Sequence, residues 1–208
     1  MRPAEPTTPD ERITLRVEGL TRTFGSLRVL NGCDLCVAPG EVVAVTGRSG
    51  AGKSTLLRIV AGLDRAFTGT VRGAGTVAMV FQEPRLLPWR TGLENVTLAT
   101  GADAATARAL LAEVGLRPQE HAYPGAMSLG QQRRLAFVRA AALHARTLLL
   151  DEPFASLDGQ TAGEAREALR RLLRRTGATA LIATHDRTDA LALCDRTVHL
   201  EGGKLRPG

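Results

Sequence analysis

Two kinds of hydrophobic pattern run along this chain of 208 residues. Residues 13–20 alternate apolar and polar side chains, which predicts a half-buried strand, and residues 29–37 offer it a partner. Residues 42–46, 147–151 and 179–183 are instead mainly apolar runs, which suit strands that are buried on both faces. The second pattern therefore predicts the centre of a parallel sheet.

Helical periodicity separates these strands. Residues 54–61 and 160–176 predict helices, and residues 92–144 are predicted to be largely helical, with Asp103 as one candidate N-cap. Residues 69–81 predict two short strands. Strands that alternate with helices predict an α/β fold with a doubly wound, mostly parallel sheet, which binds its ligand at the carboxyl ends of the strands.

Composition is ordinary for a globular chain. The hydrophobic fraction is 44%, and the length suffices for one substantial core. The sequence has no run of about 18 apolar residues, so we expect no membrane span. Residues 1–10 are polar and rich in proline. We therefore expect a flexible tail without signal-peptide character, and a cytoplasmic protein.

The net charge of +6 at pH 7 raises the question of nucleic-acid binding. Of the 27 basic residues only Lys53 and Lys204 are lysines, which indicates a coding preference for arginine rather than a dedicated basic patch. Aromatic residues make up 3% of the chain, so stacking platforms for bases are scarce. We therefore expect no nucleic-acid partner.

The cysteines are Cys33, Cys36 and Cys194. Cys33 and Cys36 have the spacing of a redox or zinc pair. They lie in a predicted strand, where residues three apart point to opposite faces, and no second pair completes a metal site. We expect cysteines that serve packing.

Residues 47–54 read Gly-Arg-Ser-Gly-Ala-Gly-Lys-Ser, the Walker A pattern, between a predicted strand and a predicted helix. Its glycines permit positive φ angles and close approach to a phosphate, and its N–H groups at a helix N-terminus attract an anion. We expect Lys53 to reach the β- and γ-phosphates of a nucleoside triphosphate, and the Ser54 hydroxyl to ligate Mg²⁺. The predicted ATP-binding residues of this segment are Gly47, Arg48, Ser49, Gly50, Ala51, Gly52, Lys53, Ser54 and Thr55.

An acidic pair, Asp151 and Glu152, ends the second buried run. A carboxylate there can hold Mg²⁺ opposite Ser54, and Glu152 can orient or deprotonate an attacking water. Three further polar residues stand at predicted strand or helix ends, where this topology expects ligand contacts: Gln82, Ser128 and His185.

Six motifs follow one another in a fixed order: residues 47–54, Gln82, Met127–Gln131, Leu148–Pro153, Ser156–Asp158 and Thr184–Asp186. In this order and spacing the chain resembles the nucleotide-binding subunit of an ATP-binding-cassette (ABC) transporter, over roughly residues 11–207. The resemblance implies a P-loop NTPase core with a mostly parallel sheet, an N-terminal antiparallel β subdomain and a small helical subdomain at about residues 91–145. All would belong to one ABC ATPase domain, residues 11–208.

The resemblance also implies roles for single residues. Four would be catalytic: Lys53, Gln82, Glu152 and His185. Three would ligate Mg²⁺: Ser54, Gln82 and Asp151. Three would form a signature that contacts the γ-phosphate bound to the other subunit: Ser128, Gly130 and Gln131. Asp158 would lie at the dimer interface, and Phe24 would bind ATP by stacking on adenine.

Structural roles remain open for several of these residues. Ser128 and Gln131 also form a capping box, Asp158 is also a suitable N-cap, and Phe24 also suits a core. Leu129 stands where the family usually has glycine, and its bulk lies near a position that must approach phosphate. We therefore expect a working but slower site.

Phe81–Trp89 resembles the corresponding segment in importers of the nitrate/sulfonate/taurine group. Trp89, with Leu86 and Leu87, would contact the permease; alternatively Trp89 covers the core of the helical subdomain. We expect a Mg²⁺-dependent ATPase on the inner face of the cell membrane that energises import of a small anion. Its expected partners are a second copy or a paralogous cassette, a separate transmembrane permease and a solute-binding protein. The alternatives are an ABC ATPase acting on ribosomes or DNA, a P-loop kinase, and a regulatory subunit with weakened ATPase.

Overall fold

The structure, a computed structural model, describes residues 14–208, so the tail predicted for residues 1–10 lies outside the described part. The strands are β1 (Leu15–Phe24), β2 (Leu27–Val37), β3 (Val42–Thr46), β4 (Thr68–Arg72), β5 (Val77–Val80), β6 (Thr147–Asp151), β7 (Thr179–Ala183), β8 (Arg196–Glu201) and β9 (Lys204–Pro207). The helices are α1 (Lys53–Val60), α2 (Gly92–Thr100), α3 (Ala104–Glu113), α4 (Leu129–Ala142), α5 (Gly159–Thr176) and α6 (Arg187–Leu193), with short 3₁₀ turns η2 (Arg117–Gln119) and η3 (Pro124–Ala126).

Two sheets organise the molecule. The larger has the strand order β5-β6-β7-β3-β8-β9. Its neighbours run parallel except for β9, which is antiparallel to β8. The smaller sheet is antiparallel, with the order β2-β1-β4. The predicted α/β class with a mostly parallel sheet and an N-terminal antiparallel sheet is therefore confirmed.

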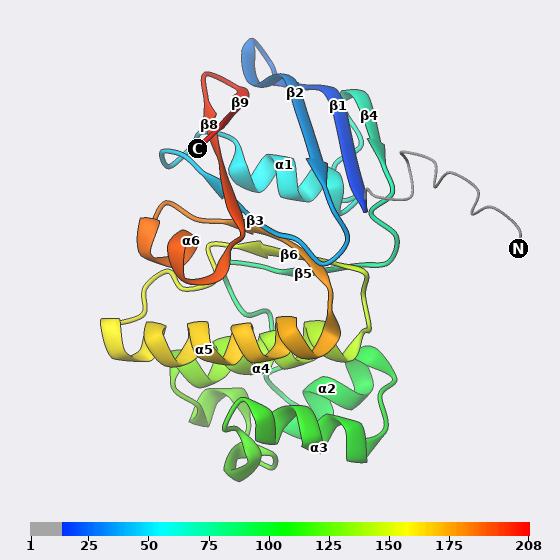
Figure 1. The fold of residues 1–208 in the computed structure, drawn as a ribbon. Coiled ribbons are helices and arrows are strands. Elements are labelled where there is room, and N and C mark those ends of the chain that lie inside the picture. The colour runs from blue at the N-terminus through cyan, green and yellow to red at the C-terminus, as the bar shows by residue number, and fades with distance from the viewer. Residues whose placement is uncertain (1–13) are drawn as a thin grey trace, which may run out of the picture.

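The layers are visible in Figure 1, where α1 lies between the two sheets and α4 and α5 lie on the opposite face of the larger sheet, with α2 and α3 beyond them. One apolar core joins the smaller sheet, α1 and the centre of the larger sheet, and includes Leu15, Leu30, Val43 and Leu57. A second joins the helical layer to the larger sheet and includes Val96, Leu111, Phe137 and Leu169. The central strands are buried on both sides, which fixes the position of the loops at their carboxyl ends.

Local signals in the sequence placed many of these elements well. The three buried runs coincide with β3, β6 and β7, and the predicted helix 160–176 begins at Gly159 in the structure. The Asp103 side chain accepts a hydrogen bond from the Thr106 amide at 2.8 Å, as an N-cap does. Gly177 ends α5 in a left-handed conformation with φ of 61°.

The first strand and the C-terminal part differ from the sequence-based expectation. β1 continues past Leu20 to Phe24. Its pairing with β2 shifts register around Leu20 and Arg22, which breaks the alternation of apolar and polar residues there, so the pattern predicted a strand that is too short. The hydrophobic pattern also did not predict α6, β8 or β9. A two-residue turn with positive φ at Gly202 and Gly203 joins β8 to β9.

The cysteines occupy separate environments. Cys33 is buried, and its thiol donates a hydrogen bond to the Gly203 carbonyl at 3.0 Å, whereas Cys36 is exposed. Burial raises the pKa of Cys33, and burial also raises the pKa of Cys194 to about 12. Residues 14–208 contain no group of three or more His, Cys, Asp or Glu side chains that could hold a metal ion. Cys33 therefore packs in the core as expected, whereas the exposed Cys36 does not, and the two residues lie on opposite faces of β2.

Candidate active site

The loop between β3 and α1 takes a conformation that its glycines make possible. Gly47, Gly50 and Gly52 have φ angles of 149°, 79° and 109°. A Cβ atom on Gly47 would lie 2.5 Å from the Leu200 carbonyl oxygen, and one on Gly52 would lie 2.8 Å from a methyl group of Val29. Both conformation and space therefore require glycine at these two positions.

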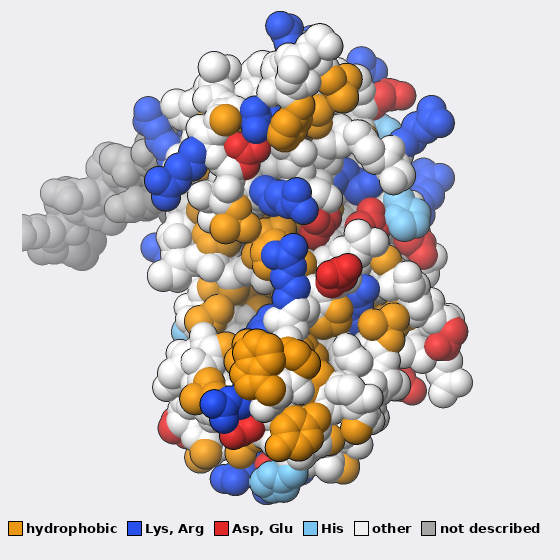
Figure 2. Space-filling view, turned by 180° about the vertical axis from the view of Figure 1, so that it is seen from behind, with side chains coloured by type: hydrophobic (Ala, Val, Ile, Leu, Met, Phe, Trp, Pro, Cys, Tyr) orange, Lys and Arg blue, Asp and Glu red, His pale blue; other side chains and the backbone are white. Residues whose placement is uncertain are grey.

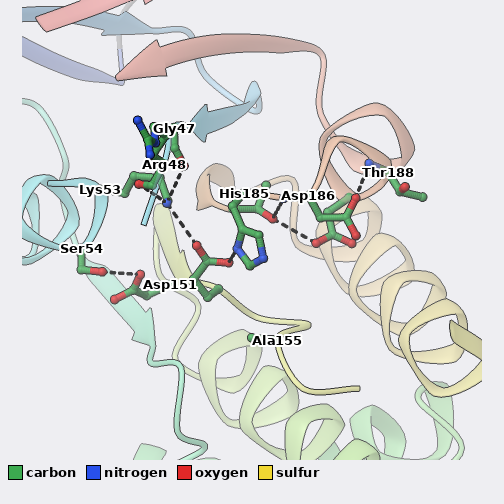
Figure 3. Close-up of polar contacts among 12 residues, drawn as sticks. Gly47, Arg48, Lys53, Ser54, Asp151, Ala155, His185, Asp186 and Thr188 are labelled. Carbon is green, nitrogen blue, oxygen red and sulfur yellow. Dashed lines mark hydrogen bonds and ion pairs between the residues drawn. The ribbon is translucent and has the colours of Figure 1, made fainter. Parts of the chain in front are cut away.

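The Lys53 side chain is hydrogen-bonded to the backbone of this loop. Its Nζ donates to the carbonyl of Gly47 at 2.9 Å and of Arg48 at 3.3 Å, and lies 3.2 Å from Oε1 of Glu152 (Figure 3). Lys53 is only 6% exposed. The ammonium group is thus held at the mouth of the phosphate loop, next to the acidic end of β6.

The acidic pair at the end of β6 faces two different partners. The Ser54 hydroxyl donates to Oδ1 of Asp151 at 2.8 Å, and burial raises the pKa of Asp151. Glu152 has φ of 47°, and its amide donates to the Ala183 carbonyl at 2.9 Å. With this unusual backbone conformation, the Glu152 carboxylate lies 3.2 Å from Nζ of Lys53 and 2.8 Å from Nδ1 of His185.

His185 completes the row of polar groups. Its Nδ1–H donates to Oε2 of Glu152 at 2.8 Å. A buried network stabilises the segment that carries it: the Asp186 amide donates to the Thr184 hydroxyl at 3.0 Å, and that hydroxyl donates to Asp189 at 3.0 Å. Arg166 on α5 pairs with Asp189 at 2.8 Å. Sequence analysis missed this support because Arg166 and Asp189 meet only in the folded chain.

A cavity of about 700 Å³ unites the predicted residues. It is lined by Val29, Arg48, Ser49, Gly50, Gly52, Lys53, Ser54, Thr55, Gln82, Glu152 and His185. The structure therefore brings the phosphate loop together with Gln82, Glu152 and His185, as the motif order predicted. Val29 was not predicted to line the site. It lies there because the fold places its side chain beside Gly52, which is distant from it in the sequence. A larger hollow of about 950 Å³ borders the same site at Arg48 and His185 but lacks Lys53, Gln82 and Glu152.

Other predicted site residues do not line this cavity. Phe24 is 47% exposed at the end of β1, and the Arg22 guanidinium covers its ring at 3.9 Å, so a core position for Phe24 is excluded. Ser128 and Gln131 form the capping box of α4, with bonds of 3.3 and 2.9 Å. Asp158 caps α5, accepting from the amides of the first turn. Ser128, Gln131 and Asp158 thus cap helices of their own chain, and neither they nor Gly130 line the cavity at the phosphate loop.

Gly130 and Leu129 begin α4 at a close helix contact. A Cβ atom on Gly130 would lie 2.2 Å from a methyl group of Thr161 on α5, so only glycine fits there. Leu129 precedes it and is partly exposed. The leucine that departs from the family pattern therefore points its bulk outward, whereas Gly130 provides the tight contact.

The segment after Gln82 exposes the large apolar side chain of Trp89, whereas Leu86 and Leu87 are half-buried. Trp89 is 67% exposed, which contradicts the alternative that it covers the core of the helical layer. Leu86 instead packs against that core. The fully buried Asn95 fixes the turn: its Oδ1 accepts from the Leu87 amide at 2.7 Å, and its Nδ2 donates to the carbonyls of Leu87, Arg90 and Thr91. Figure 2 shows hydrophobic side chains gathered over the helical layer on the face turned away in Figure 1.

The fold and the phosphate loop define a P-loop nucleoside triphosphatase. A model of the ABC transporter family matches residues 30–155. The chain is 47% identical over 193 residues to the aliphatic sulfonates import ATP-binding protein SsuB 3 of Nocardia farcinica, covering 92% of this chain and 78% of the relative. It is 46% identical over 195 residues to SsuB 1 of Frankia alni, covering 93% of this chain and 73% of the relative.

Solved structures agree with this match. A dimeric ATP-binding cassette in a post-hydrolysis state, bound to ADP and phosphate, aligns with a TM-score of 0.79 at 28% identity, over 92% of this chain and 96% of the other. A metal-chelate type ABC transporter in an inward-facing conformation shares the fold, with a TM-score of 0.84 at 23% identity over 95% of this chain and 83% of the other. The chain belongs to the ABC transporter family, as one of its ATP-binding, ATP-hydrolysing proteins. No helix within residues 14–208 is both long and apolar enough to cross a membrane.

Proposed function

We propose that this protein hydrolyses ATP to drive the import of an aliphatic sulfonate or a similar small anion through a separate permease. The observation that carries the proposal is the cavity in which the phosphate loop, Gln82, Glu152 and His185 meet. The solute class is supported by the names of the sulfonate-import relatives alone.

The catalytic roles follow from position and charge. Lys53 would donate to the β- and γ-phosphates of ATP, together with the N–H groups of the loop at the start of α1. Glu152 would orient the attacking water and take up its proton. His185, hydrogen-bonded to Glu152, would stabilise charge on the γ-phosphate. These groups converge from the carboxyl ends of β3, β6 and β7.

The oxygen donors beside the loop fit Mg²⁺. The Ser54 hydroxyl and Asp151 carboxylate lie 2.8 Å apart, and Gln82 lines the same cavity as Ser54. A hydroxyl, a carboxylate and an amide oxygen are hard ligands of the kind that this ion takes. When bound there, Mg²⁺ would neutralise charge on the β- and γ-phosphates.

The working form would be a dimer in which each site uses both copies. Ser128, Gly130 and Gln131 stand on a capped helix N-terminus outside the cavity, which suits a phosphate bound to the other copy. Asp158 and Phe24 would then lie at the interface and at the adenine ring. One domain, residues 11–208, would carry these functions, with the helical subdomain at about residues 91–145.

The exposed apolar segment around Trp89 would bind the permease. The Trp89 side chain is exposed on a turn whose conformation Asn95 fixes, and exposed apolar surface of this kind marks protein contacts. The protein would then be peripheral on the inner face of the cell membrane, with a solute-binding protein on the other side.

Two measurements test the proposal. Phosphate release by the purified protein should require Mg²⁺, and Lys53→Ala should weaken ATP binding, whereas Lys204→Ala should leave it unchanged. Absence of Mg²⁺-dependent hydrolysis would favour a regulatory subunit with weakened ATPase. Affinity purification of the tagged protein from solubilised native membranes should recover a multi-span permease. Recovery of ribosomal or DNA-bound partners from the soluble fraction would refute the transport function and leave the ATPase intact.

A further inference from the structure

One arginine of α4 joins two segments of the site. Nη1 of Arg133 donates to the Phe81 carbonyl at 3.3 Å, and Nη2 donates to the Ala155 carbonyl at 3.3 Å. The residue is only 3% exposed. A single planar guanidinium therefore links the end of the β5 segment to the turn between β6 and α5.

Both carbonyls are close in sequence to cavity residues. Phe81 directly precedes Gln82, which lines the cavity. Ala155 lies in the turn that follows Glu152, and its amide donates to the Glu152 carbonyl at 3.2 Å (Figure 3 labels Ala155 beside this turn). A shift of the Glu152 turn consequently moves one partner of Arg133, and a shift of the Gln82 loop moves the other.

Stability alone does not explain a charge at this position. Within residues 14–208 Arg133 forms no ion pair, its Nε has no hydrogen-bond partner, and burial lowers its pKa. Its hydrogen bonds go only to neutral carbonyls, and the nearby charge of Glu83 offsets the effect of burial only in part, so an apolar side chain of similar volume would stabilise the fold at least as well. The guanidinium is instead suited to hold two backbone segments at a defined separation.

A second arginine of α4 holds the same loop further along. Arg139 donates to the Arg85 carbonyl at 2.8 Å and to the Pro84 carbonyl at 3.1 Å. Arg85 has φ of 47°, and its guanidinium lies 3.8 Å from the centre of the Phe81 ring. The loop from Gln82 to Trp89 is thus attached to α4 at two carbonyls, and at a third on Phe81 directly before it, and of these two arginines only Arg133 also reaches the Glu152 turn.

We propose that Arg133 is a positioning residue that transmits the state of Glu152 to Gln82 and the loop carrying Trp89, a role that rests on the proposed ATPase function. Glu152 forms an ion pair with Lys53, whose Nζ lies 3.2 Å from Oε1. Phosphate bound at Lys53 opens this pair and lets the Glu152 turn move. The movement reaches the Phe81 carbonyl through the two hydrogen bonds of Arg133.

Trp89 provides the readout, because it is the one tryptophan of the chain and lies in the loop itself. Its fluorescence is measured with and without a non-hydrolysable ATP analogue and Mg²⁺ in wild type, Arg133→Met and the control Arg134→Met. Arg134 is the next residue of α4 and donates to the Val114 carbonyl at 3.3 Å, away from both segments. ATP affinity and the rate of phosphate release are measured on the same samples.

We expect the analogue to change Trp89 emission in wild type and in Arg134→Met. Arg133→Met should bind the analogue with a Kd within about twofold of wild type, lose most of the emission change, and hydrolyse ATP about tenfold more slowly. If the role of Arg133 were purely structural, Arg133→Met would have a lower melting temperature, but the protein that still binds the analogue would show the normal change in Trp89 emission.

Several results would overturn the inference. An Arg133→Met protein whose emission responds like wild type would do so, and so would a wild-type protein that binds the analogue without any emission change. If Arg133→Met does not fold, Arg133→Lys keeps the charge but cannot hold both carbonyls in the planar geometry, and a full response in that variant would equally overturn it. A wild-type chain that binds no ATP refutes the proposed function, whereas normal binding with an intact response in Arg133→Met refutes this inference alone.

Discussion

Replacement of Glu152 by glutamine should tighten ATP binding while it abolishes turnover. In the structure Glu152 holds the ammonium group of Lys53, which the phosphates of ATP need. Binding therefore requires that this ion pair opens. Glu152→Gln keeps the size of the side chain and removes its charge, so the nucleotide meets a lysine that is free to bind it.

The size of the gain follows from the geometry. At 3.2 Å the Coulomb attraction between Lys53 and Glu152 is about 5 kcal/mol for an effective dielectric constant near 20. Two effects make the net gain smaller than this value. Glutamine still accepts a hydrogen bond from Lys53, and opening the ion pair restores part of the hydration of Lys53 and Glu152. We therefore expect about 1–2 kcal/mol in binding free energy, a decrease in Kd of roughly 5–30-fold. Loss of the general base should lower kcat by about 10²–10⁴-fold.

Calorimetric titration with ATP and Mg²⁺ measures the affinity, and phosphate release measures turnover. Size-exclusion chromatography with ATP should show a trapped dimer for the variant. Glu113→Gln is the matched control, since it removes a surface ion pair with Arg175 far from the cavity and should change neither value. Equal or weaker ATP affinity of Glu152→Gln would refute the competition between Glu152 and phosphate, and turnover near the wild-type rate would refute its catalytic role.

Three further predictions concern neighbouring parts of the molecule. Leu129→Gly should raise the ATPase rate, because it removes bulk beside the predicted trans phosphate contact; an unchanged or lower rate would count against that reasoning. Asn95→Ala removes the four hydrogen bonds of a buried side chain, and the Leu87 amide and the Arg90 carbonyl lose this partner, whereas the Leu87 and Thr91 carbonyls keep bonds from the Arg90 and Asn95 amides. Thermal unfolding should therefore show a decrease in the free energy of unfolding of about 2–4 kcal/mol, while Asn31→Ala, at a partly exposed residue, should change it by less than about 0.5 kcal/mol. In timed labelling with a maleimide at pH 7.5, the exposed Cys36 should react well before Cys194, whose thiol pKa is about 12; equal rates would refute the burial of Cys194.

Features whose signal is local could be predicted from the sequence. The phosphate loop, the capping box of Ser128 and Gln131, and the Asp103 cap each depend on side chains within a few residues of one another. Continuous apolar runs identified β3 and β6 for a similar reason, since burial on both faces removes every polar position. The motif order then correctly united Gln82, Glu152 and His185 in one cavity.

The remaining features depend on contacts between distant parts of the chain. Arg133 reads as one more surface arginine in a chain with many, and only the fold places two backbone carbonyls beside it. The support of His185 likewise combines Thr184 and Asp189 with Arg166 of another helix. The roles of Phe24 and the signature residues stay predictions, because they depend on a nucleotide and a second copy of the chain.

The strand that carries the phosphate loop has consequences for how the protein is made. β3 pairs on one side with β7, where Val43 lies opposite Leu181, and on the other with β8, where Val43 lies opposite Arg196. Both neighbours leave the ribosome more than 130 residues after β3 itself, so this strand has no partner strand until residues 179–201 have been made. The N-terminal antiparallel sheet can form earlier, whereas the ATP site must wait for β7 and β8. Nucleotide can therefore stabilise the nascent protein only after these two strands are made, and a chain that terminates before them exposes an unpaired apolar strand to quality-control proteases.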